Sequence, residues 1–253
     1  MNKSFDILGV KVAVTNLLHT CSLLEQWIKE ERDKTYVCLA PVATIVDCQT
    51  DQKYYQVVSQ AGIVTPDGMP LVWLGRLKGY KNIQRTYGPD LMKAFCGLSE
   101  GQGYRHYFYG GSAETNALLT KKLLENFPRL QIVGSFSPPL RQIGEKEDQD
   151  ILDQINHACP DILWVGLGSP KQDYLMSQHR DLLNVPVMVG VGAAFDFIAG
   201  TKKQAPRWMQ RSGLEWIFRL CSEPGRLWRR YLIGNTKFIW FLLLDVTKRR
   251  RYR

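Results

Sequence analysis

Three apolar stretches of the sequence end in glycine, and each is followed by a segment of helical character. The glycines are Gly110 and Gly111, Gly166 and Gly168, and Gly190 and Gly192. Glycine lets backbone N–H groups come close to a phosphate, and the helix that follows adds a favourable partial charge. Three such turns in series predict a nucleotide or phosphate site at the carboxyl ends of strands. None matches GxGxxG, so a dinucleotide site of the NAD type is not expected.

Two aspartates accompany these turns. Asp67 lies in TPDGMP, directly after an apolar run. It is either a turn residue that accepts nearby backbone N–H groups or a general base at the rim of the crevice. Asp196 follows the last glycine turn. It is either an acceptor for ribose hydroxyls or a first-turn carboxylate stabilised by its helix.

Other polar residues give weaker indications. Lys171 and Gln172, in GLGSPKQDYL, are placed to contact a diphosphate and a sugar, or are ordinary polar residues at a helix start. Asp148 and Asp150 form a DxD-like pair, but they fall on the polar face of an amphipathic segment. The four histidines have no HxxxH spacing and the six cysteines no CxxC pair. We therefore predict no metal site and no cofactor.

Positive charge is concentrated at the C-terminus. The chain has a net charge of +9, but residues 201–253 alone carry 14 Lys or Arg and three acids, a net of +11. The first 200 residues have a net charge of −2. A basic segment of this kind predicts an anionic partner, which is nucleic acid, an anionic membrane surface or a substrate phosphate.

The basic segment also contains tryptophan and tyrosine beside arginine. Its arginines include Arg219, Arg226, Arg229 and Arg230. They form a solvated basic face, or they bind phosphate oxygens at a lipid headgroup interface. The apolar run KFIWFLLLDV that follows is about 15 Å long as a helix, half the thickness of a bilayer core. It can pack on the body or lie at the interface, but it cannot span a membrane.

The elements that would position these residues alternate regularly. Apolar strand-like runs at 36–41, 104–110, 130–136, 161–168 and 185–192 are separated by helical segments, with one helix expected from 42 to about 61 and another over 88–98. This alternation predicts an α/β fold, a Rossmann-like parallel sheet flanked by helices. We divide the chain into a catalytic domain over 1–200 and a basic, helical, membrane-binding appendage over 201–253.

Seven motifs carry a family resemblance. They are TPDGMPLVW, RTYGPDLM, YFYGGSAETN, GSFSPPL, WVGLGSPKQD, VGVGAAFDFIAG and APRWMQRSGLEWIFRLCSEPGRLWRRY, in this order over residues 60–231. Together they closely resemble the WecG/TagA/CpsF glycosyltransferases of bacteria. The resemblance implies an inverting, metal-independent enzyme that takes N-acetylmannosamine, its uronic acid or glucose from a UDP-sugar. The acceptor would be a polyprenyl-diphosphate-linked sugar at the cytoplasmic membrane face, in surface polysaccharide or teichoic acid synthesis.

The resemblance also implies roles for individual residues. Asp67 matches the catalytic base and Arg85 an active-site arginine, while Gln172 and Asp196 match positions in the donor pocket. To these donor-binding residues the glycine turns add Gly110, Gly111 and Gly168. The arginines matching those that engage the lipid diphosphate are Arg219, Arg226 and Arg229.

The chain departs from the family pattern at one place. After the first apolar run, LAPVATIV stands where many members have an Asn-containing TPN-type segment, so no polar contact is expected from Val42. The expected partners are the lipid-linked acceptor and an anionic membrane surface, with no nucleic acid. The sequence leaves a homo-oligomer open. Two other functions also stay open: a nucleic-acid-binding module that uses the basic tail, and a nucleotide-sugar hydrolase of the same fold.

Overall fold

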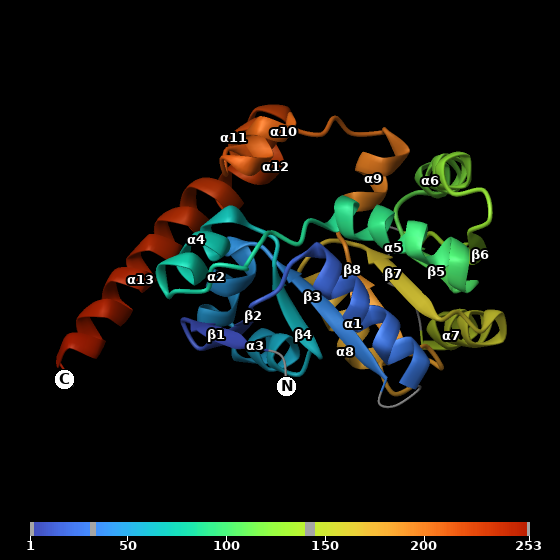
Figure 1. The fold of residues 1–253 in the computed structure, drawn as a ribbon, viewed down its shortest axis with the longest axis horizontal. Coiled ribbons are helices and arrows are strands. Elements are labelled where there is room, and N and C mark those ends of the chain that lie inside the picture. The colour runs from blue at the N-terminus through green and yellow to red at the C-terminus, as the bar shows by residue number, and fades with distance from the viewer. Residues whose placement is uncertain (1–2, 31–33, 140–144, 252–253) are drawn as a thin grey trace.

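A parallel β-sheet forms the centre of the molecule (Figure 1). The computed structural model describes residues 3–30, 34–139 and 145–251. The sheet has six strands in the order β4–β3–β8–β7–β5–β6. They are β3 (Thr35–Ala40), β4 (Ile63–Pro66), β5 (Arg105–Gly110), β6 (Gln131–Phe136), β7 (Ile162–Gly166) and β8 (Val187–Gly190). The predicted α/β fold with a Rossmann-like parallel sheet is confirmed.

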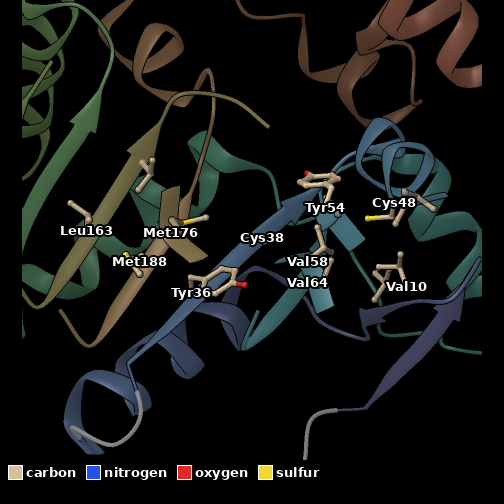
Figure 2. Packing of buried hydrophobic residues seen from close by; sticks show 14 of the residues in the cluster. Val10, Tyr36, Cys38, Cys48, Tyr54, Val58, Val64, Leu163, Met176 and Met188 are labelled. Atoms are coloured by element: carbon tan, nitrogen blue, oxygen red, sulfur yellow. The ribbon is translucent and has the colours of Figure 1, made fainter. Parts of the chain in front are cut away.

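Helices cover both faces of this sheet. One face carries α1 (Leu17–Glu30), α5 (Gly88–Gln102), α6 (Ala113–Asn126) and α9 (Ala194–Ala199). The other carries α2 (Val42–Thr50), α3 (Gln52–Ser59), α7 (Glu145–Ala158) and α8 (Lys171–His179). Successive side chains of a strand point to opposite faces, so Val37 and Leu39 pack against the first group of helices and Tyr36 and Cys38 against the second. Figure 2 shows the second of these two cores.

The helix expected from 42 to about 61 is in fact two helices, because the chain breaks at Asp51. The backbone of Asp51 is extended, with φ −127° and ψ 102°. Its side chain accepts a hydrogen bond from the N–H of Tyr54 at 3.0 Å, which caps the new helix. The prediction of one helix was wrong because an internal aspartate can act as an N-cap as readily as it can lie on a helix face.

An N-terminal hairpin and helix α1 were not predicted. The hairpin pairs β1 (Ser4–Ile7) with β2 (Val10–Ala13), and the turn residues Leu8 and Gly9 both have positive φ. Such a turn suits the twist of a two-residue hairpin. Val10 packs into the core near Val58 and Val64 (Figure 2), so the hairpin extends the core past the edge strand β4.

The C-terminal helices are α10 (Arg207–Arg211), α11 (Glu215–Ser222), α12 (Pro224–Trp228), the π-helical turn η1 (Arg229–Ile233) and α13 (Gly234–Arg251). The chain is interrupted at Glu223, since α11 ends at Ser222 and α12 begins at Pro224. Helix α13 has 18 residues, longer than the apolar run, and its Phe238 is buried in the core beside α2. The domain boundary at residue 200 and the membrane-binding role of 201–253 stay predictions, and residues 252–253 lie outside the described ranges.

None of the helices in the described ranges is both long and apolar enough to cross a membrane.

Candidate active site

Two cavities open at the carboxyl ends of the strands and meet at Asp67. The smaller, of about 220 Å³, is lined largely by polar groups and backbone, and we call it the polar cavity. The larger, of about 540 Å³, is lined largely by apolar side chains, and we call it the apolar cavity. Four residues line both cavities: Pro41, Asp67, Arg219 and Arg230. This shared wall is called the junction below.

The polar cavity lies where the fold predicts a ligand crevice. Strands β3 and β8 are neighbours, but β3 leads into α2 on one face of the sheet and β8 leads into α9 on the other. Ligands of open α/β sheets bind at such a switch point, outside the carboxyl ends of the strands. The wall contains Gly166, Gly168, Gly190 and Gly192 from two of the three glycine turns.

Gln172 holds these two turns together. The side chain is only 2% exposed, and its Oε1 accepts hydrogen bonds from the N–H groups of Gly168 at 3.0 Å and Gly192 at 2.9 Å. Its Nε2 donates to Ser169 Oγ at 3.3 Å. The two glycine N–H groups, which we expected to face a phosphate, are therefore bonded within the protein. Gln172 lines the cavity as predicted, and its observed contacts fix the shape of the wall.

Asp196 lines the polar cavity and is linked to the C-terminal helices. Its carboxylate lies 3.1 Å from Lys202 Nζ and accepts a hydrogen bond from Thr201 Oγ1 at 3.3 Å. Lys202 also lies 3.7 Å from Glu223, which in turn pairs with Arg226 at 2.6 Å. Arg226 lines the polar cavity too. One side of the cavity is thus a chain of alternating charges.

The first glycine turn is not part of either cavity. Gly110 and Gly111 both have positive φ, but neither lines the polar cavity. A Cβ at Gly110 would come within 2.7 Å of the Gly166 backbone, so this glycine allows β5 and β7 to approach each other closely. Its carbonyl oxygen accepts a hydrogen bond from Asn116 Nδ2 at 2.9 Å. Gly110 therefore has a packing role between two strands, and the predicted part of Gly110 and Gly111 in donor binding stays a prediction.

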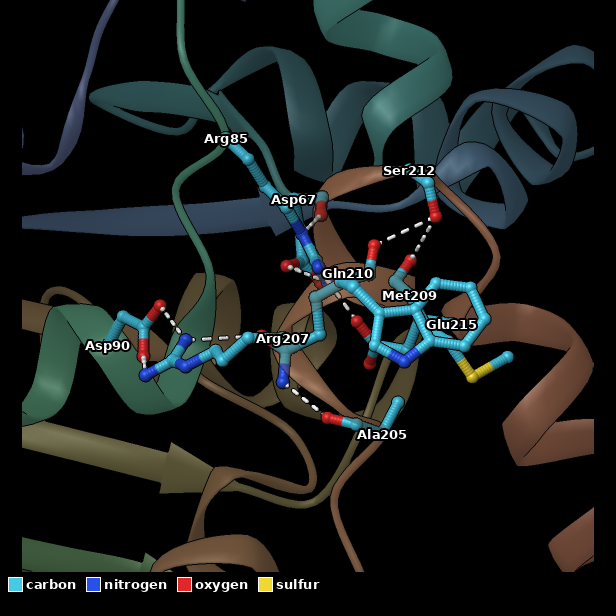
Figure 3. A network of polar contacts seen from close by, with 10 residues as sticks. Asp67, Arg85, Asp90, Ala205, Arg207, Met209, Gln210, Ser212 and Glu215 are labelled. Atoms are coloured by element: carbon cyan, nitrogen blue, oxygen red, sulfur yellow. Dashed lines mark hydrogen bonds and ion pairs between the residues drawn. The ribbon is translucent and has the colours of Figure 1, made fainter.

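Asp67 is held at the junction by Arg85 (Figure 3). The Asp67 N–H donates to the carbonyl of Ala40 at 3.0 Å, which fixes the turn after β4 (Ile63–Pro66) against the end of β3. Arg85 donates from Nε to the Asp67 carbonyl oxygen, and its Nη2 lies 3.4 Å from Asp67 Oδ1. The Arg85 guanidinium also lies over the Tyr87 ring, 4.1 Å from the centroid. Asp67 and Arg85, each predicted separately as an active-site residue, are thus in direct contact.

Glu215, the first residue of α11, belongs to this site and was not predicted. Its carboxylate is buried and lies 2.7 Å from Arg85 Nη1. Burial raises the pKa of the Asp67 carboxyl above its usual value, the positive charge of Arg85 opposes this rise, and the negative charge of Glu215 adds to it. The only available indication in the sequence was that Glu215 is one of three acids in a strongly basic segment.

The predicted arginines are not equivalent in the structure. Arg219 lines both cavities and Arg226 the polar one, but Arg229 lines neither, and its guanidinium lies 5.2 Å from the centre of the Trp228 ring. Arg230, which was not among the arginines predicted to engage the lipid diphosphate, lines both cavities. Within the described ranges, no carboxylate lies at ion-pair distance from Arg219 or Arg230. Two arginines that have no ion-pair partner in the described ranges therefore line the junction.

The apolar cavity lies between α4 (Met69–Leu77) and the C-terminal helices. Its apolar lining includes Met69, Trp73, Leu74, Leu77, Phe238, Ile239 and Leu242. Val42, from the segment that departs from the family pattern, lines this cavity as well. Leu77 is 84% exposed and Ile239 59% exposed, so the wall continues onto an exposed apolar surface.

The described residues contain no group of three or more His, Cys, Asp or Glu side chains arranged to hold a metal ion. Of the DxD-like pair, Asp148 lies in the first turn of α7 and its carboxylate is 3.1 Å from His179 Nε2. That contact is remote from the two cavities, whose lining includes neither residue.

Comparisons with known proteins agree on one family. A sequence model of the "Glycosyl transferase WecG/TagA/CpsF family" matches residues 5–252. An N-acetylglucosaminyldiphosphoundecaprenol N-acetyl-beta-D-mannosaminyltransferase of Bacillus subtilis (strain 168) is 32% identical over 183 residues, 72% of this chain and 69% of that protein. A protein of the same name from Bacillus spizizenii is 29% identical over 83% of this chain and 80% of its own length. Another, from Staphylococcus aureus (strain MRSA252), is 26% identical over 97% and 93%.

Proposed function

Because the chain belongs to the WecG/TagA/CpsF family of glycosyl transferases, we propose that it transfers N-acetylmannosamine from a UDP-sugar to a polyprenyl-diphosphate-linked sugar. One observation carries the proposal. Asp67 and two arginines without carboxylate partners in the described ranges, Arg219 and Arg230, lie where a polar and an apolar cavity meet. A transferase that joins a water-soluble nucleotide sugar to a lipid needs such a junction.

In this proposal the polar cavity takes the donor. It lies at the switch point of the sheet, where nucleotides bind in open α/β folds. Asp196 and the backbone of the glycine turns present acceptors for ribose and base, and Lys202 and Arg226 add positive charge at the rim. Since Gln172 already occupies two turn N–H groups, the diphosphate would be bound mainly by side-chain cations, with Arg219 and Arg230 nearest the junction.

The apolar cavity takes the acceptor. An acceptor of this class has an apolar chain, a diphosphate and a sugar, in that order. The walls from α4 and α13 match the chain, and the junction arginines match the diphosphate. The sugar hydroxyl would then lie beside Asp67. The relatives' names specify an N-acetylglucosaminyl-diphosphoundecaprenol acceptor, and we propose the same class for this chain.

Asp67 acts as the general base. The acceptor hydroxyl passes its proton to an Asp67 carboxylate oxygen as the hydroxyl oxygen bonds to the anomeric carbon, and the bond from that carbon to the UDP oxygen breaks with inversion. A raised pKa makes the Asp67 carboxylate a stronger base than an ordinary aspartate. The departing diphosphate gains negative charge, which Arg219 and Arg230 stabilise without a metal ion.

A peripheral position on an anionic membrane belongs to the same proposal. The exposed apolar side chains of α13 include Ile239, Trp240 and Leu243, in a segment rich in Lys and Arg. Apolar burial together with attraction to anionic lipids would hold this helix at the interface. An acceptor anchored in the bilayer could then enter the apolar cavity without leaving it completely.

The test is a panel of UDP-sugars with a short polyprenyl-diphosphate-linked N-acetylglucosamine, with products read by mass spectrometry. We expect transfer from UDP-N-acetylmannosamine. Asp67→Asn should keep UDP binding and lower turnover by about 10²–10⁴-fold, the usual scale for general base catalysis. Wild-type turnover in this variant would remove the base assignment.

The same panel separates the two other functions. Release of free sugar at equal rates with and without acceptor would identify a nucleotide-sugar hydrolase. Salt-sensitive RNA binding with no binding of UDP would instead identify a nucleic-acid-binding module.

A further inference from the structure

Glu215 is a buried carboxylate that the C-terminal helices bring into the active site. It begins α11, lines the apolar cavity, and its side chain is 10% exposed. Within the described ranges its charge is met by Arg85 alone at ion-pair distance. Burying a carboxylate is costly unless a charge compensates it. A leucine or glutamine would meet the packing requirement without that cost, so the charge itself needs an explanation.

Arg85 lies between two carboxylates and pairs with them unequally (Figure 3). Its Nη1 is 2.7 Å from Glu215 Oε2, whereas its Nη2 is 3.4 Å from Asp67 Oδ1. Its Nε bonds the backbone oxygen of Asp67, not the carboxylate. The short, charge-assisted contact therefore goes to Glu215, and the carboxylate of Asp67 is left with the longer one.

From this geometry we infer that Glu215 is a positioning residue: it engages Arg85 and so keeps the Asp67 carboxylate loosely paired and available as a base. The inference rests on the proposed function of Asp67. Without Glu215, the Arg85 guanidinium would be free to form a two-pronged pair with Asp67. A carboxylate paired in that way is a weaker base and is also less accessible to a hydroxyl.

The charges around Asp67 support this balance. The titratable groups that act on it are Arg85 and Tyr87 before α5, Glu215 and Arg219 on α11, and Arg230 and Tyr231 in η1. The three arginines lower the pKa of Asp67, while burial and the charge of Glu215 raise it. Removal of the Glu215 charge takes away one of the effects that raise the pKa of Asp67. It also frees Arg85 to pair more closely with Asp67, which lowers that pKa further. Both changes lower the pKa of Asp67, so it must fall.

A second ion pair offers a matched control. Arg207 of α10 makes a bidentate pair with Asp90 of α5, at 2.8 and 3.0 Å (Figure 3). This pair also joins the C-terminal helices to the body, but neither residue lines either cavity. If Glu215 only helped to dock these helices, loss of the Arg207–Asp90 pair would have the same kind of effect.

The experiment compares Glu215→Gln, Glu215→Asp and Asp90→Asn in the full-length chain. The first readout is the pH dependence of kcat/KM with a short, detergent-soluble acceptor. The second, independent of activity, is the titration of the Asp67 side-chain carboxyl by carbon-13 NMR, with the resonance assigned from its loss in Asp67→Asn.

For Glu215→Gln we expect the acidic limb of the pH profile and the NMR midpoint of Asp67 to move to lower pH by about one unit or more. This is the usual effect of a close positive charge on a carboxyl, which Arg85 would exert once it is released from Glu215. The maximal rate should fall, because the base is weaker. Glu215→Asp should restore part of the shift. Asp90→Asn should raise KM with no shift in either titration.

Three results would overturn the inference. One is an unchanged Asp67 midpoint in Glu215→Gln, and another is an equal shift in Asp90→Asn. The third is loss of the acidic limb in Glu215→Gln with near-normal turnover in Asp67→Asn, which would make Glu215 the base. If the wild-type chain transfers no sugar, the proposed function fails, and the NMR titration still decides whether Glu215 controls Asp67.

Discussion

Arg229 and Arg230 are adjacent arginines that the structure places in different surroundings, which allows a strict test of the junction. Arg230 lines both cavities, whereas Arg229 lines neither and lies over the Trp228 ring. We expect Arg230→Ala to impair transfer and Arg229→Ala to leave it nearly unchanged. Both variants lose one positive charge from the same turn, so general effects of net charge are matched.

The size of the difference follows from the contacts. A hydrogen bond to a charged group contributes about 1.5–3 kcal/mol, which corresponds to about 10- to 100-fold in kcat/KM. Arg230 has no ion-pair partner in the described ranges, so its removal leaves no carboxylate there newly unpaired. The free energy of unfolding should therefore change little, and the loss should appear in activity alone.

The assay must use a short acceptor that is soluble in detergent. Each basic residue near an anionic bilayer contributes about 1 kcal/mol to membrane binding, so on vesicles both variants would lose activity for a reason unrelated to the site. Unfolding in urea provides the stability control. An equal or larger loss of kcat/KM in Arg229→Ala would refute the assignment of Arg230 to the junction.

Three further predictions test other parts of the site. Gln172→Met should leave the two glycine N–H groups unpaired and lower the free energy of unfolding in urea by about 2–4 kcal/mol, whereas Ser169→Ala should have a much smaller effect. Transfer should persist in EDTA; loss that Mg²⁺ or Mn²⁺ restores would contradict the metal-independent mechanism. Replacing exposed Trp240 or Leu243 on α13 with serine should weaken vesicle binding about 10-fold or more each, without changing activity on a soluble acceptor, since neither lines a cavity.

The central fold could be predicted because its signals are local. Each buried strand is a short apolar run, and the period of the intervening segments changes to that of a helix. The family membership carried by the motifs was predicted correctly for the same reason. The break at Asp51 was missed because a polar residue between two apolar helical segments fits one long helix equally well. The β1–β2 hairpin was missed because its turn is Leu8–Gly9 rather than an Asn-Gly pair.

The polar cavity could be located from the sequence, but the roles within it could not all be assigned. A parallel sheet brings the carboxyl ends of β3, β7 and β8 to one edge, so the glycine turns there had to meet. Whether a turn N–H points at a ligand or at Gln172 depends on a side chain from another element. The packing role of Gly110 could not be predicted for the same reason, because it depends on how closely strand β5 approaches the Gly166 backbone of β7.

The place of Arg230 at the junction could not be predicted from the sequence. Arg229 was assigned by its match to the family motif, and such a match does not give the direction of a side chain. Arg219 lies on α11 and Arg226 on α12, and the chain is interrupted at Glu223 between them, so one helical period of 3.6 residues does not relate these arginines to one another. Arg229 and Arg230 then begin η1, a π-helical turn with more residues per turn than an α-helix. The basic segment thus contains the charges that the site needs, and the arrangement of its short elements places Arg230 rather than Arg229 in the wall of both cavities.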